Sequence, residues 1–163
     1  MNVGDVERVA FRFSRGELAA LLQLMGAPEL PGMDLRAAMP EAAVEALLVE
    51  SGIVTPCGAR TFVDRTIAAV LNNALRARRM LRAESPEGRA ALYAAEQMCV
   101  LVATKDADLV SLEPFPDGAA AKAAFMAALD ALGPGAKLFL TAEGAERAGG
   151  ARALYERFEK GGV

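Results

Sequence analysis

The chain contains no histidine, and this absence decides which kinds of catalytic site the sequence can build. Histidine is the usual general base, proton shuttle and metal ligand, because its unperturbed pKa lies near neutral pH. Ser–His and Cys–His nucleophile pairs are therefore excluded, as are most zinc sites. We expect a protein that is not an enzyme, with no catalytic residues, no metal site and no cofactor.

Other motifs that carry chemistry are missing too. A phosphate-binding loop requires a Gly–Lys pair, which does not occur in the sequence. The segment from Gly133 to Gly135 begins like a dinucleotide-binding motif, but its third glycine is absent and it precedes a predicted strand. None of the serines is followed by lysine three residues later, as a Ser–Lys dyad requires.

The two cysteines, Cys57 and Cys99, are too far apart for a Cys-x-x-Cys pair. Cys99 lies in a run of apolar residues, where we expect a small buried hydrophobic side chain. Cys57 lies between Pro56 and Gly58 and should be nearer the surface. A reactive thiol is an alternative there, because Arg60 is close in sequence.

Two groups of charged residues are candidates for binding a partner. Arg76, Arg79 and Arg82 cluster near the end of a predicted helix, where positive charge also complements the helix dipole. Asp106 and Asp108 form an Asp-x-Asp in a predicted hairpin connection. They could hold a divalent cation, although aspartates of this kind commonly stabilise a turn and the full calcium-loop pattern is missing.

Length and composition favour a single domain over residues 1–163. The net charge of −3 and the pI of about 5.1 disfavour a nucleic-acid binder that acts through its overall field. No apolar run approaches the roughly 20 residues that span a bilayer. Asp5 and Glu7 stand where a signal peptide would be apolar, so we expect a cytoplasmic protein without a membrane partner.

The first half of the chain predicts short helices and strands. Ser14 and Glu17 form a capping box, which should begin a helix that ends at Gly26. In the helix over 40–51, we expect Leu47 to face inward. The predicted elements are a strand over 6–13, helices over 14–26 and 40–51, a hairpin or ordered loop over 53–63, and a helix from Asp64 to about Arg82.

The second half predicts a three-stranded meander over 89–97, 98–104 and 109–113. A helix over 117–132, a strand over 137–140 and a last helix capped by Thr141 should follow. The fold class is therefore α+β, with an antiparallel β-meander and packed helices. The strands over 9–13 and 137–140 each precede a hydroxyl cap, which suggests two pseudo-repeated strand–helix units.

The order of elements resembles the EspG family, the cytosolic chaperones of type VII secretion. The segments that carry the resemblance are FRFSRGELAAL over 11–21, ALLVESGI over 46–53 and VLVATKDADLVSLEP over 100–114. The likeness covers residues 6–132, rests on element order and apolar pattern, and transfers no functional residue. It implies a chaperone whose partner is a helical hairpin.

Two functions follow as hypotheses. The first is a non-enzymatic adaptor or chaperone that binds a helical segment of another protein and forms a homodimer. The second is a winged-helix-like DNA-binding regulator, with the helix over 40–51, the segment over 52–63 and the arginine-bearing helix as its parts. The glutamates on the helix over 40–51 oppose the second hypothesis, because recognition helices present basic and polar side chains.

Overall fold

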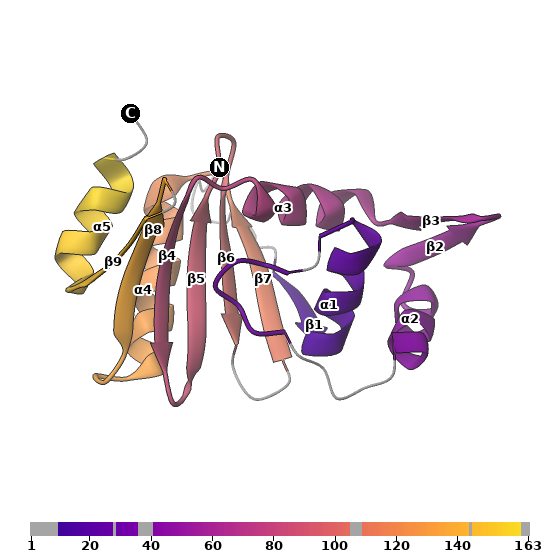
Figure 1. The fold of residues 1–163 in the computed structure, drawn as a ribbon, viewed down its shortest axis with the longest axis horizontal. Helices are drawn as coiled ribbons and strands as arrows, with labels where there is room; N and C mark the ends of the chain where they lie inside the picture. The colour runs from indigo at the N-terminus through magenta and orange to yellow at the C-terminus, as the bar shows by residue number, and fades with distance from the viewer. Residues whose placement is uncertain (1–9, 28, 36–40, 105–108, 144, 161–163) are drawn as a thin grey trace, which may run out of the picture.

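The computed structural model describes residues 10–27, 29–35, 41–104, 109–143 and 145–160. Its centre is an antiparallel sheet of seven strands in the order β1-β7-β6-β5-β4-β8-β9, and β2 and β3 form a separate hairpin (Figure 1). The strands are β1 (Phe11–Ser14), β2 (Val54–Cys57), β3 (Arg60–Val63), β4 (Arg79–Ser85), β5 (Gly88–Ala94), β6 (Cys99–Thr104), β7 (Leu109–Phe115), β8 (Lys137–Ala142) and β9 (Ala145–Gly149). Asp106 and Asp108 lie outside the described residues.

Helices cover both faces of this sheet. They are α1 (Arg15–Leu24), α2 (Glu41–Glu50), α3 (Arg65–Leu75), α4 (Gly118–Leu132) and α5 (Ala151–Lys160). In Figure 1, α4 lies behind the sheet, α5 lies beside β9, and the β2–β3 hairpin extends away from the other strands near α2. The predicted α+β class with an antiparallel meander is confirmed. None of the described helices combines the length and apolar character needed to cross a membrane.

Alternation along the strands divides the core into two layers, since successive side chains point to opposite faces of a sheet. Met80, Tyr93 and Val102 belong to the cluster that packs against α1 and α3, and we call this side the α1/α3 face. Leu81 and Leu92 belong to the cluster that packs against α4 and α5, on the α4/α5 face. The central strands are apolar on both sides because both sides are covered.

Side-chain caps fix where three helices begin. Ser14 and Glu17 form the predicted capping box, with the Glu17 N–H donating to the Ser14 Oγ at 3.1 Å. The Asp64 Oδ1 accepts from the backbone N–H groups of Thr66 and Ile67, each at 3.0 Å. Asp117 caps α4 through the Ala119 N–H at 2.9 Å. These contacts satisfy donors that the first helical turn leaves unpaired.

The prediction of one helix from Asp64 to about Arg82 is wrong. α3 ends at Leu75, and the chain then forms β4, which pairs with β5 on one side and β8 on the other. Alanine and arginine are strong helix formers, so local propensity favoured continuing the helix. Pairing with two strands and burial of Met80, Leu81 and Ala83 override that propensity. Arg79 and Arg82 therefore lie on a strand, and only Arg76 lies at a helix end.

Two smaller predictions also differ from the structure. Thr141 lies within β8, and β9 intervenes before α5, so the strand over 137–140 does not lead directly into the last helix. Leu47 was expected to face inward but is 45% exposed, because α2 packs against α1 through Val44 and Leu48. Cys99 is half-buried, whereas full burial was expected.

The start of β5 depends on a glycine. A Cβ atom on Gly88 would lie 2.8 Å from the Thr104 carbonyl oxygen, which belongs to the paired strand β6 and cannot move without disturbing the ladder. We predict that Gly88→Ala lowers the free energy of unfolding by about 1–3 kcal/mol in denaturant titrations. Gly135→Ala is the control, because nothing lies within 4 Å of its Cβ position. Equal stabilities of the two variants would contradict this account of the close contact.

Candidate functional site: a basic cleft

A cleft of about 1230 Å³ lies at one end of the sheet. Its walls come from the end of α3, the segment leading into β4, the end of β5, the β8–β9 hairpin and the last turns of α5. Ala94 and Ala142 flank Arg79 across three neighbouring strands, since Arg79 pairs with both. The cleft thus exists because β4 lies between β5 and β8.

Positive charge dominates the lining of the cleft. The described residues that line it include six cationic side chains and two carboxylates, although the whole chain carries a net charge of −3. The carboxylates are Glu96 and Glu143, and the cations are Arg76, Arg78, Arg79, Arg147, Arg157 and Lys160. None of these cations forms an ion pair within 4.0 Å with a described residue. The cleft is therefore a local basic site on an acidic protein.

Helix dipoles account for only part of this charge. Arg76 is the C-cap of α3, and Arg157 and Lys160 lie in the last turn of α5, where cations complement the partial negative charge of a helix C-terminus. Arg79 and Arg147 lie on strands and have no such role. The positive charge of the cleft thus exceeds what the two helix ends require.

Arg79 differs from the other cations of the cleft. Its guanidinium carbon lies 5.2 Å from the centroid of the Phe158 ring, a cation–π contact with α5. Its Nη1 is shielded from solvent and has no hydrogen-bond acceptor among the described residues. Arg79 is half-buried, whereas the other five cations are exposed. A charge in this setting attracts an anion more strongly than an exposed charge does.

Two groups near Arg79, the thiol of Cys99 and the hydroxyl of Tyr155, have raised pKa values. Burial raises the pKa of the Cys99 thiol, and the positive charge of Arg79 only partly opposes this. Burial also raises the pKa of Tyr155 to about 12, with smaller contributions from Glu159 and Cys99. Both groups are therefore neutral at neutral pH, so neither supplies Arg79 with a counter-charge.

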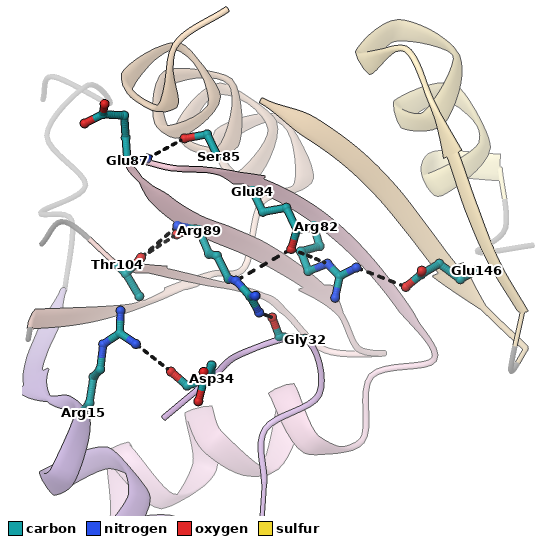
Figure 2. A network of polar contacts seen from close by, with 10 residues as sticks. All are labelled: Arg15, Gly32, Asp34, Arg82, Glu84, Ser85, Glu87, Arg89, Thr104 and Glu146. Atoms are coloured by element: carbon teal, nitrogen blue, oxygen red, sulfur yellow. Dashed lines mark hydrogen bonds and ion pairs between the residues drawn. The ribbon is translucent and has the colours of Figure 1, made fainter. Parts of the chain in front are cut away.

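Arg82 lies on the opposite face of the sheet, because it is three residues from Arg79 on the same strand. Its Nη2 lies 3.3 Å from the Glu146 Oε2 and its Nε lies 3.7 Å from the Glu84 Oε2 (Figure 2). Its guanidinium carbon also lies 4.7 Å from the centroid of the Phe139 ring. Arg82 is thus neutralised within the fold and does not line the cleft.

The network around Arg82 also holds the segment 29–35 against the sheet. Glu84 Oε2 lies 3.7 Å from Arg89 Nε, and the Arg89 Nη1 donates to the Gly32 carbonyl oxygen at 3.4 Å (Figure 2). The Tyr93 hydroxyl donates to the Pro31 carbonyl oxygen, and burial raises the pKa of Tyr93 far above its usual value. This polar network has a structural role on the α1/α3 face.

The structure separates the candidate residues that the sequence had grouped. Arg76 and Arg79 line the cleft, Arg82 does not, and Asp106 and Asp108 lie outside the described residues. Sequence reasoning missed three cations that come from the C-terminal part of the chain, namely Arg147, Arg157 and Lys160. Nothing in the sequence indicates that these three residues lie near Arg76 and Arg79, because they are far from them along the chain. The pairing of β8 with β4 brings them to the cleft.

A second exposed surface lies on α2 and the β2–β3 hairpin, in the N-terminal half of the chain. α2 is apolar on several sides, yet Leu47 and Val49 are 45% and 40% exposed. Phe62, on the β2–β3 hairpin, is 54% exposed. Cys57 is exposed on the same hairpin and pairs with Arg60 across it, and no described contact activates its thiol. Nothing in this region gathers charge as the cleft does.

No protein-family model matches this chain, and no curated protein matches it by sequence. Among the described residues, no three Cys, Asp or Glu side chains come together in a way that could hold a metal ion.

One residue that lines the cleft, Glu143, has a strained backbone conformation. Glu143 has a φ of 52°, a left-handed conformation that costs most residues about 1 kcal/mol and that asparagine adopts more readily. We predict that Glu143→Asn raises the free energy of unfolding by up to about 1 kcal/mol in denaturant titrations. Glu96→Asn makes the same charge change in the same cleft without a left-handed backbone, and should have a smaller effect. A loss of stability in Glu143→Asn would contradict the interpretation.

The raised pKa of Tyr155 predicts a dependence of stability on alkaline pH. The unfolded chain ionises this group near pH 10, whereas the folded chain keeps it neutral until about pH 12. Its contribution is present below pH 10 and is lost as the pH rises through this window. Wild-type stability should therefore fall more steeply between pH 10 and 12 than that of Tyr155→Phe, measured by urea unfolding. Parallel pH profiles would show that Tyr155 titrates normally.

Proposed function

We propose that this protein is a non-enzymatic adaptor that binds a helical segment of another protein, and that the basic cleft receives acidic side chains of that segment. The observation that carries the proposal is a set of six cations around one cleft of an acidic chain, none of which forms an ion pair with a described residue. Electrostatic complementarity of this kind steers and orients a protein partner.

The size of the cleft supports a macromolecular ligand. Small-molecule pockets usually enclose about 300–1,000 Å³, and this cleft encloses about 1230 Å³. A helix is about 10–12 Å across and rises about 5.4 Å per turn, so about two turns would occupy such a volume. A short helical segment therefore fits the cleft better than a metabolite does.

Carboxylates suit the cleft better than phosphates do. Phosphate sites commonly use the N–H groups at a helix N-terminus, but α3 and α5 both present their C-terminal ends here. Arginine pairs with carboxylates and with phosphates through two parallel hydrogen bonds, so the five arginines among the six cations suit either group. The orientation of the two helices therefore favours an acidic protein segment.

The DNA-binding alternative has less support. The exposed part of α2 carries Glu45 and Glu50, which would repel a phosphate backbone. The described lining of the basic cleft contains no aromatic side chain on which bases could stack. We therefore keep the adaptor as the proposal. The resemblance to EspG chaperones, whose partners are helical hairpins, belongs to the same proposal and agrees with a helical ligand.

Binding of a defined peptide tests the proposed function. The probe is a fluorescent helical peptide of about 15 residues, with Glu on one face, Leu and Ala on the other, and an amidated C-terminus. We predict that the peptide binds, gains helical circular dichroism, and binds more weakly as NaCl rises from about 50 to about 200 mM. Arg147→Glu should weaken binding about threefold or more, measured by fluorescence anisotropy.

Matched controls separate the cleft from general surface charge. Arg152→Glu makes the same charge change as Arg147→Glu, but its side chain lies on α5, is 96% exposed and does not line the cleft. This variant should therefore bind the peptide as the wild type does. A peptide with Gln in place of Glu should bind weakly. An equally acidic peptide interrupted by proline should also bind more weakly, because it cannot become helical. Tighter binding of an oligothymidylate, or equal binding of the Gln peptide, would contradict the proposal.

A further inference from the structure

The cations of the cleft fall into two classes by environment. Five are exposed, where water screens their charge and an ion pair is worth little. Arg79 is half-buried on β4, and its Nη1 is removed from solvent without a hydrogen-bond acceptor among the described residues. An unpaired donor of this kind carries a cost that a suitable acceptor would remove.

The contacts of Arg79 within the fold do not supply that acceptor. The Phe158 ring, 5.2 Å from the guanidinium carbon, attracts the charge but accepts no conventional hydrogen bond from it. The nearby Cys99 thiol has a raised pKa and is neutral at neutral pH. Glu96 and Glu143 line the same cleft, yet neither lies within ion-pair distance of Arg79.

Arg82, on the same strand, provides a comparison, because it is an arginine with a structural role. Its side chain is 16% exposed and also lies beside an aromatic ring, that of Phe139. The fold places two carboxylates beside it, those of Glu84 and Glu146. The Arg82 Nε, like the Arg79 Nη1, has no hydrogen-bond acceptor in the part of the chain that the structure describes. The two arginines on this strand thus have similar aromatic contacts, but between them only Arg82 has carboxylates within ion-pair distance among the described residues.

We infer that Arg79 is the anchor of the cleft, and that it takes one Asp or Glu side-chain carboxylate of the partner through charge-assisted hydrogen bonds. The inference rests on the proposed function and names the residue that determines its specificity. The five exposed cations steer the acidic segment toward the cleft, whereas Arg79 holds one carboxylate in a partly desolvated position. Interfaces commonly divide the work in this way between a central anchor and a charged rim.

Arg79→Met is compared with Arg157→Met, which removes an exposed cation of the same cleft. Without ligand, Arg79→Met should raise the denaturation midpoint, because methionine fills the site without an unpaired charge, and Arg157→Met should leave it almost unchanged. A lower midpoint for Arg79→Met would show that Arg79 stabilises the fold, and would overturn the inference.

Glutarate provides a test that does not depend on the helical peptide. At tens of millimolar, it should raise the midpoint of the wild type and of Arg157→Met relative to NaCl of equal ionic strength, and should leave Arg79→Met unchanged. Equal glutarate effects in Arg79→Met and the wild type, or no effect in either, would overturn the anchor role. Failure of the acidic peptide to bind the wild type, together with an Arg79-dependent glutarate effect, would overturn the proposed function and leave the anchor standing.

Binding of the acidic peptide then tests whether Arg79 contributes more to affinity than an exposed cation of the cleft does. Arg79→Met should weaken its binding at least about tenfold more than Arg157→Met does. Equal losses in the two variants would mean that Arg79 acts only as one more positive charge, and would overturn the inference. The amidated C-terminus of the peptide leaves only side-chain carboxylates to occupy the site.

Discussion

The two-residue alternation of β4 is the constraint on which the rest of this account depends. β4 pairs with β5 and β8 and is covered on both faces. The pairing register therefore fixes the face of the sheet to which each of its side chains points. Arg79 must lie on the α4/α5 face and Arg82 on the α1/α3 face. A shift of one residue in the pairing would exchange the two arginines and bury the wrong apolar set.

The position of β4 explains why a single strand contributes to two different polar arrangements. On the α1/α3 face, Arg82 is surrounded by Glu84 and Glu146 in a network that also reaches the segment 29–35. On the α4/α5 face, Arg79 lines the cleft together with cations from the end of α3, from β9 and from α5. Arg82 thus has carboxylates beside it, whereas Arg79 forms no ion pair with a described residue. The proposed adaptor function depends on this difference.

Local signals predicted the parts of the fold that depend on neighbouring residues. The capping box at Ser14, the helix starts at Asp64 and Asp117 and the three-stranded meander all follow from short-range patterns. β4 was missed because its composition suits a helix and its partner β8 lies about fifty residues later. The Ser85–Gly88 turn was the available signal, since a two-residue hairpin connection implies a strand before it as well as after it. Arg76 and Arg79 were found from sequence, but their proximity to Arg147 depends on strand order, which no local pattern encodes.

The most direct measurement follows the guanidinium NMR signals of Arg79 and Arg82 while the acidic helical peptide is added. The account predicts that the Arg79 signal shifts and its side-chain exchange with water slows, because a carboxylate now accepts from it. The Arg82 signal should stay where it is, because its two carboxylates are already in place. A peptide that binds without moving the Arg79 signal, or that moves both signals equally, would contradict the account.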